Sequence, residues 1–312
     1  MTVRQARCYG TEILSEVRGP EKSATPALDA DVLLQHILSC DKTFLLFHGD
    51  TDLAPEHESV FREYVRKRCT GLPVAYITGH KEFYGYDFSV SPATLIPKPD
   101  TELLVEKALE AIAEMRSRSP ERILSVCDMC AGTGCVGISI VKACAETGIV
   151  PADMLPLLTL SDISADALAL ARLNARNLLS MHKSASVVFS RSNLFGNLGG
   201  TFDIIVSNPP YVPASETSEL LKDGRSEPAL ALNGDVELDG SPSGTDDGLS
   251  VMRNLVPQCY EHLSPGGILL AESGEYNAPD TKNIFERAGF SEVRAYMDLS
   301  GQMRVTEGRK PL

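Results

Sequence analysis

The chain contains Phe202-Asp203-Ile204-Ile205-Val206-Ser207-Asn208-Pro209-Pro210-Tyr211, a short apolar run that ends in two prolines. Residues 202–206 are mostly apolar and β-branched, which predicts a buried strand. Proline has a fixed φ and no amide hydrogen, so the strand ends before Pro209. Ligands in open α/β sheets bind outside the carboxyl ends of the strands. The corner at Asn208 is therefore a candidate site.

The chemistry of this corner suits the binding of a planar amino group. The side-chain oxygen of Asn208 and the carbonyl of Pro209 can each accept a hydrogen bond from one –NH2 group. Pro210 stiffens the corner, and Tyr211 offers an aromatic face. We therefore take Asn208, Pro209 and Tyr211 as candidate catalytic residues, and Asn208 to Tyr211 as the candidate substrate site. The alternative is an ordinary proline-rich turn, which we disfavour because a glycine loop lies upstream.

The glycine loop follows a second expected strand at 123–127. It reads Asp128-Met129-Cys130-Ala131-Gly132-Thr133-Gly134-Cys135-Val136-Gly137 and leads into an expected helix at 138–146. Three of its glycines match the G-x-G-x-x-G pattern in the strand–turn–helix context that nucleotide sites use. Glycines allow a ligand to approach the backbone closely at a helix start. The pattern does not identify the cofactor.

Asp162 follows the expected strand at 157–160. A carboxylate in this position can bind both hydroxyls of a ribose. The alternative is that Asp162 supports the start of the expected helix 165–178, for which Ser164 is a good N-cap. We favour the ribose role because of its place after the second strand.

The expected strands alternate with helices along most of the chain. This order predicts an α/β fold with a doubly wound, mostly parallel sheet of seven strands, closed by an antiparallel hairpin. The first 82 residues instead show four or five short helical patterns, and aromatic residues around Gly85 suggest a linking β-hairpin. We expect a helical recognition domain at 1–82 and a catalytic domain with its linking hairpin at 83–312. The seven strands are expected at 123–127, 157–160, 186–189, 202–206, 268–271, 292–297 and 303–307.

Composition narrows the function classes. The net charge of −13 argues against a general nucleic-acid binder, which needs a basic face. No run approaches the ~18 apolar residues of a membrane span, and the first residues do not form a signal peptide. We expect a cytoplasmic monomer. Cys127 and Cys130 lack the second ligand pair of a zinc site, so no metal is expected. Residues 233–247, rich in Gly, Asp and Ser, predict a mobile acidic surface loop.

With these motifs in place, the chain resembles the HemK-type release-factor glutamine N5-methyltransferases, a branch of the S-adenosylmethionine-dependent class I methyltransferases. The resemblance covers nearly the whole chain. It is carried by Leu28-Asp29-Ala30, Gly71-x-Pro73-x-Ala75-Tyr76-Ile77-x-Gly79, Glu82-Phe83-x-Gly85, Leu95-Ile96-Pro97-Lys98-Pro99-Asp100-Thr101-Glu102, the glycine loop, Asp162-Ile163-Ser164, Ser207 to Tyr211, Glu227-Pro228, Asp247-Gly248-Leu249 and Pro265-Gly266-Gly267.

The resemblance implies a helical domain that docks a peptide chain release factor and a catalytic domain that methylates the glutamine of its Gly-Gly-Gln loop. It implies S-adenosylmethionine as the cofactor and S-adenosylhomocysteine as the product. Asn208 to Tyr211 would hold the glutamine amide. The cofactor-binding positions would be Asp128, Cys130, Ala131, Gly132, Thr133, Gly134, Asp162, Asn193, Leu194 and Asn208.

The chain departs from the family pattern at three places. Cys130 stands where the first glycine of the loop is usual, Asn193 stands where an acidic residue is usual, and an acidic insertion covers residues 235–245. Four alternative functions remain. The chain could methylate a glutamine of a ribosomal protein, methylate adenine N6 in nucleic acid, act as a nicotinamide dehydrogenase, or bind release factors without catalysis.

Overall fold

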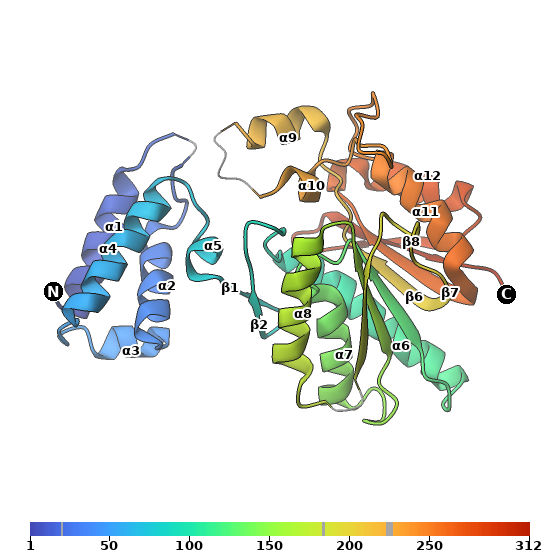
Figure 1. Ribbon diagram of the computed structural model, residues 1–312, viewed down its shortest axis with the longest axis horizontal. Helices are drawn as coiled ribbons and strands as arrows, with labels where there is room; N and C mark the ends of the chain where they lie inside the picture. Colours follow the sequence, from blue (N-terminus) through green and yellow to red (C-terminus); the bar gives the residue numbers. More distant parts are fainter. Residues whose placement is uncertain (20, 183–184, 223–226) are drawn as a thin grey trace. The chain divides into compact units, whose positions relative to one another are not determined.

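The computed structural model describes residues 1–19, 21–182, 185–222 and 227–312. Within these ranges the chain forms two compact units (Figure 1). The first runs over Met1–His80, and the second over Lys81–Lys222 and Glu227–Leu312. The division falls next to the predicted boundary after residue 82. That the two units are independent domains stays a prediction.

The first unit is helical, as the apolar spacing predicts. Leu33, Leu34, Phe61 and Val65 are fully buried between its helices. Gly10 packs so tightly that an added Cβ would lie 2.8 Å from the ring of Phe61. The helices are α1 (Val3–Glu16), α2 (Pro26–Leu38), α3 (Lys42–Phe47), α4 (Pro55–Cys69) and α5 (Val74–Thr78).

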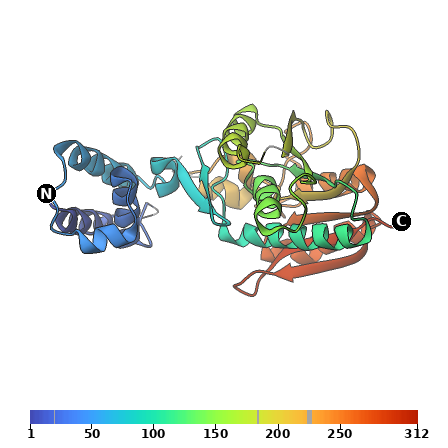
Figure 2. The ribbon, with the colours of Figure 1, turned by 90° about the horizontal axis from the view of Figure 1, so that it is seen from below.

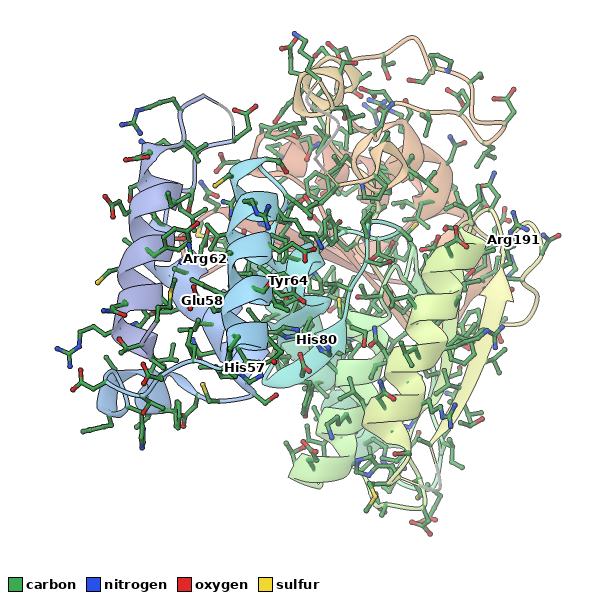
Figure 3. All side chains as sticks on the ribbon, turned by 60° about the vertical axis from the view of Figure 1, so that its left-hand side comes forward. His57, Glu58, Arg62, Tyr64, His80 and Arg191 are labelled. Carbon is green, nitrogen blue, oxygen red and sulfur yellow. The ribbon has the colours of Figure 1, made fainter. Side chains whose placement is uncertain are left out.

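Ion pairs join the helices of this unit. Asp29 on α2 accepts hydrogen bonds from Ser23 and from Arg68, at 2.7 Å each. This gives the Leu28-Asp29-Ala30 motif a structural reason within the helical unit. On α4, Glu58 and Arg62 lie one turn apart (Figure 3), with a guanidinium nitrogen 3.0 Å from the carboxylate.

The second unit is built on a seven-stranded sheet in the order β5-β4-β3-β6-β7-β9-β8. The five strands from β5 to β7 are parallel, and β9 is antiparallel to both of its neighbours. The predicted fold class and its closing hairpin are confirmed. The strands are β3 (Ser125–Met129), β4 (Leu157–Asp162), β5 (Ser186–Arg191), β6 (Phe202–Ser207), β7 (Leu263–Glu272), β8 (Ser291–Met297) and β9 (Met303–Arg309).

Helices cover both faces of the sheet, which is why β6 is buried at all its positions. Ile204 and Val206 belong to the core beneath α6, α7 and α8, whereas Ile205 belongs to the core beneath α11 and α12. Helix α6 runs along the sheet (Figure 2). The principal helices are α6 (Glu102–Arg118), α7 (Cys135–Thr147), α8 (Ala165–Leu179), α11 (Ser250–His262) and α12 (Ala278–Arg287).

Shorter elements complete this unit. The predicted hairpin is present as a separate two-stranded sheet, whose Phe83 and Phe88 are buried in the core. Asn174 of α8 holds it, because its side chain exchanges hydrogen bonds with the Ser89 backbone. These elements are β1 (His80–Phe83), β2 (Tyr86–Ser89), η1 (Pro99–Thr101), α9 (Ala214–Leu220), α10 (Ala229–Leu232) and η2 (Glu275–Asn277).

The prediction of a mobile, acidic surface loop at 233–247 is wrong only at its start, around Asp235, whereas residues 237–242 are exposed as predicted. Asp235 is buried and accepts hydrogen bonds from the backbone amides of Ala214 and Gly248 and from the hydroxyl of Thr245. A buried carboxylate that accepts three hydrogen bonds ties the two ends of the segment together. Composition could not predict this, because it does not distinguish a buried aspartate from exposed acidic residues nearby in the sequence.

None of the helices in the described ranges has the length and apolar character to cross a membrane. Among the same residues, no group of three or more potential metal-binding side chains occurs. Cys127 is buried in β3 and Cys130 lies in the following turn, as predicted from the sequence.

Candidate active site

A cavity of about 180 Å³ lies at the carboxyl ends of β3, β4, β5 and β6. The predicted cofactor residues line it, with the exception of Gly134, and so does Pro210 of the predicted substrate site. Sequence reasoning missed a second group of lining residues, which come from the segment before η1, from α10 and from the acidic loop. This group includes Thr94, Pro97, Leu230, Val236, Glu237, Leu238 and Gly240.

The turn after β3 and the first turn of α7 need their glycines for different reasons. Gly132 has a φ of +54°, and an added Cβ there would meet only open space. Gly137 packs against the sheet, where a Cβ would lie 2.8 Å from Leu158 and Leu160. Cys130 also has a positive φ of 62°. A left-handed residue favours glycine, which explains why the resembling family has glycine at this position.

Asp128 supports the turn from the end of β3. Its carboxylate accepts a hydrogen bond of 2.9 Å from the Gly137 amide. Burial raises the pKa of Asp128 most strongly, the hydrogen bond from Gly137 lowers it, and the negative charge of Asp162 raises it. Together these effects place the pKa at about 7.

This pKa predicts how stability varies with pH. An unfolded aspartate titrates near 3.9, so between about pH 4 and 7 the folded chain binds more protons at Asp128 than the unfolded chain. The free energy of unfolding therefore falls as pH rises through this window. We expect Asp128→Asn to reduce that fall, measured by denaturant unfolding at the two ends of the window. The exposed Asp153→Asn is the matched control. An unchanged slope in Asp128→Asn would contradict the prediction.

Asp162 is held on the cavity wall by two backbone amides. It accepts hydrogen bonds from Gly132 at 2.9 Å and from Ser164 at 2.8 Å. Burial raises its pKa, and these hydrogen bonds lower it. Ser164 itself caps α8 by accepting from the Ala167 amide. Asp162 thus supports the helix start and also faces the cavity; its role as the ribose ligand stays a prediction.

Asn193 is oriented by the acidic loop. Its side-chain nitrogen donates a hydrogen bond to the carbonyl of Leu238, which leaves the amide oxygen as an acceptor. An acceptor is also what an acidic residue would provide at this position. Val236 and Leu238 are the signal that could have placed this loop at the cavity, because apolar residues are rare in its sequence.

Asn208 lies at the cavity with its amide orientation fixed. Its nitrogen donates a hydrogen bond of 3.1 Å to the hydroxyl of Thr101, and the buried Ser207 hydroxyl donates to the carbonyl of Met129. The side-chain oxygen of Asn208 is therefore the group free to accept from a ligand. An acceptor oxygen at the cavity is what the binding of an –NH2 group requires.

Pro209 and Tyr211 are placed differently from Asn208. Among the described residues, neither lines the cavity. Pro209 is buried, and the Tyr211 hydroxyl donates a hydrogen bond of 3.1 Å to Glu272. Burial and the charge of Glu272 raise the pKa of Tyr211. The predicted contact of the Tyr211 ring with substrate, and the role of the Pro209 carbonyl, stay predictions.

The segment before η1 is clamped by Glu227. Its carboxylate accepts from the Ile96 amide at 3.0 Å and from the Lys98 ammonium at 2.8 Å. Lys98 and Pro228 both line the cavity. These hydrogen bonds connect two motifs that carry the resemblance, Leu95 to Glu102 and Glu227-Pro228, and give both a structural role.

The doubly wound, seven-stranded sheet with a glycine turn after β3 is the fold of a class I methyltransferase. Residues 102–224 match the family model "Methyltransferase small domain", and residues 6–79 match "PrmC N-terminal domain". A methyltransferase of known structure from Pyrococcus furiosus aligns with 74% of this chain and 92% of its own, with 16% identity and a TM-score of 0.47.

Relatives from two bacteria cover almost the whole chain. A release factor glutamine methyltransferase from Koribacter versatilis is 35% identical over 315 aligned residues, covering 100% of this chain and 99% of its own. One from Escherichia coli is 32% identical, with 96% of each chain covered. The chain belongs to the release factor glutamine methyltransferases.

Proposed function

We propose that this chain transfers a methyl group from S-adenosylmethionine to the side-chain amide nitrogen of the glutamine in the Gly-Gly-Gln motif of peptide chain release factors. The observation that carries the proposal is the fixed polarity of Asn208. Its nitrogen is bound to Thr101, so its oxygen is presented to the cavity. A glutamine –NH2 group needs such an acceptor.

The cavity has features that fit S-adenosylmethionine. Gly132 leaves open space over the turn, Asp162 offers carboxylate oxygens, and Asn193 offers an amide acceptor. These groups suit a ligand with ribose hydroxyls and an adenine amino group. Asp128, Cys130 to Gly134, Asp162, Asn193 and Leu194 would hold it. When bound, S-adenosylmethionine supplies a methyl group on a positively charged sulfur.

The chemistry is a direct displacement. The amide nitrogen forms the new C–N bond while the C–S bond breaks, its electron pair stays on sulfur, and the nitrogen gives up one proton to solvent. An amide nitrogen is a poor nucleophile because its lone pair is delocalised. Hydrogen bonds to Asn208 and to the Pro209 carbonyl would aim the nitrogen and stabilise the positive charge that develops on it.

The remaining parts of the proposal concern partners and location. The helical unit would dock the release factor, the protein would act as a cytoplasmic monomer, and it would not bind nucleic acid directly. The net charge of −13 supports the last point.

The test is methyl transfer from labelled S-adenosylmethionine to a release factor, beside a copy whose Gly-Gly-Gln glutamine is changed to alanine. Label on the first and not on the second is expected. Label on neither, with cofactor binding intact, would reject the proposal and direct the same assay to ribosomal proteins and nucleic acid.

A further inference from the structure

Residues 236–242 form a small hairpin at the edge of the cavity, which we call the rim hairpin. Val236 and Pro242 pair as antiparallel bridge partners. Between them, the Glu237 amide donates a hydrogen bond of 2.8 Å to the carbonyl of Ser241. This stretch, although acidic and exposed, therefore has a defined backbone.

Part of the rim hairpin faces the cavity. Four of its residues line the cavity wall, namely Val236, Glu237, Leu238 and Gly240. Leu238 is 45% exposed, and two other apolar residues of the same wall, Ile163 and Leu230, are 43% and 55% exposed. Apolar side chains gathered at one cavity favour a ligand that covers them from water. The adenosine part of S-adenosylmethionine has such an apolar face.

Asn193, which follows β5, holds the rim hairpin against the cofactor side of the cavity. Its side-chain nitrogen donates a hydrogen bond to the carbonyl of Leu238. A carbonyl only accepts hydrogen bonds, so the group of residue 193 that faces it must be a donor. An amide supplies this donor and keeps its oxygen for a ligand. A carboxylate has acceptors only, and would place two oxygens against each other.

Both partners of this contact have a fixed backbone. The carbonyl of Asn193 accepts a hydrogen bond of 3.0 Å from the Gly196 amide, which closes the turn after β5. On the other side, the buried Asp235 directly precedes the rim hairpin and accepts hydrogen bonds from the amides of Ala214, at 3.1 Å, and Gly248, at 2.9 Å. The contact therefore joins two positioned segments of the chain.

We propose that the rim hairpin is the outer wall of the adenosine subsite, and that Asn193 is the residue that positions it. This inference rests on the proposed function for the place of the cofactor in the cavity. Leu238 would cover apolar surface of the adenosine, and the Asn193 oxygen would accept a hydrogen bond from it. Because the contact with Asn193 is made within the chain, the wall is preorganised and costs less to order when the cofactor binds.

The amide at position 193 and the rim hairpin are thus a matched pair. The sequence departs from the family pattern at both places, with Asn193 where an acidic residue is usual and an insertion at 235–245. In this chain the carbonyl of Leu238 approaches residue 193, and an amide is the side chain that accommodates both this carbonyl and an amino group of the ligand. Two departures that are separate in sequence have one structural reason.

The first test measures the Kd for S-adenosylhomocysteine by titration calorimetry. This ligand has no charge on sulfur, so an added carboxylate does not act on a sulfonium. Asn193→Asp keeps an acceptor for the ligand and loses the donor to Leu238. We expect its Kd to rise roughly 10-fold, the effect of losing one hydrogen bond whose acceptor is left unpaired. A Kd equal to that of the wild-type chain would overturn the proposal.

Asn197→Asp is the matched control for this substitution. It adds the same charge four positions further along the chain, and among the described residues Asn197 does not line the cavity. Its Kd for S-adenosylhomocysteine should be unchanged. A rise equal to that of Asn193→Asp would mean that the added charge alone weakens binding, and would reject the role of the Leu238 contact.

The second test repeats the substitution without the rim hairpin. Replacing residues 237–241 by Gly-Gly joins the two bridge partners through a two-residue turn and keeps Asp235 in place. Thermal unfolding checks that this shortened chain is folded. It lacks the carbonyl of Leu238, so Asn193→Asp should not weaken binding further, and the two changes should be non-additive. A penalty as large as in the full chain would show that Asn193 acts on the ligand alone, and would overturn the proposal.

Leu238→Ala tests the wall itself, because it removes the apolar side chain and keeps the backbone carbonyl. We expect the Kd for S-adenosylhomocysteine to rise roughly 3- to 10-fold from the apolar surface that is lost. Leu299→Ala is the control, since Leu299 is fully exposed and, within the described ranges, lies outside the cavity. Equal Kd values for the two variants would reject the contact between Leu238 and the ligand.

These titrations use no release factor, so they separate this inference from the proposed function. If the chain methylated no release factor but gave this pattern of Kd values, the proposed function would fail and the role of the rim hairpin would stand. If it methylated a release factor and Asn193→Asp bound S-adenosylhomocysteine as tightly as the wild-type chain, the proposed function would stand and this inference would fail.

Discussion

Asn208→Ala is expected to lower kcat roughly 100- to 1,000-fold, as the loss of one transition-state hydrogen-bonding group does in other enzymes, or about 3–4 kcal/mol. The alanine removes the oxygen that faces the cavity and leaves the Thr101 hydroxyl without its donor. The loss should fall mainly on kcat, because the hydrogen bond to the amide strengthens as positive charge develops on nitrogen.

Single-turnover methylation of a release factor measures this loss without interference from product release. Asn197→Ala is the matched control, since Asn197 lies after β5 and, among the described residues, does not line the cavity. Thermal unfolding of both variants checks that the fold is kept. Near-normal turnover in Asn208→Ala with an unchanged fold would remove Asn208 from the mechanism.

Gly248→Ala is expected to have a large effect on stability and activity together. An added Cβ would lie 2.0 Å from the carbonyl oxygen of Tyr211, which is backbone and cannot rotate away. The φ of +71° adds a cost of about 1–2 kcal/mol for a residue with a side chain. With overpacking of about 1–3 kcal/mol, the free energy of unfolding should fall by roughly 2–5 kcal/mol.

Activity should fall as well, because Tyr211 is part of the substrate corner. A displacement on the order of 1 Å at reacting groups costs about 100-fold in rate. Gly244→Ala is the matched control, because Gly244 has a similar φ of +77° but nothing within 4 Å of an added Cβ. It should cost only about 1–2 kcal/mol and leave turnover unchanged. Equal losses of stability in the two variants, by denaturant unfolding, would contradict the packing argument.

Much of the fold follows from periodicity and turn chemistry. The apolar run that ends at Asn208 is β6, and the glycine loop opens α7, because short buried strands and glycine turns leave local patterns. The gathering of the proposed cofactor residues at the ends of β3, β4 and β5 could also be expected, since parallel strands bring their carboxyl ends to one edge.

Other parts of the site depend on contacts between distant residues and leave no local signal. Glu272 ends an apolar strand, and nothing near it in sequence shows that it accepts a hydrogen bond from Tyr211. Gly248 is one glycine among many until the backbone of Tyr211 is placed beside it. Asp235 reads as part of an acidic surface, yet the structure buries it.

The segment from Asn233 to Gly248 touches both of the proposed ligand subsites. Through Leu238 it holds Asn193 on the cofactor side, and through Gly248 it packs against Tyr211 on the substrate side. Asp235 ties these two ends into one piece. If the two subsites are as proposed, binding of either ligand would act on a wall that the other also contacts. By thermodynamic linkage, if binding of one ligand raises the affinity for the other by some factor, binding of the other raises the affinity for the first by the same factor.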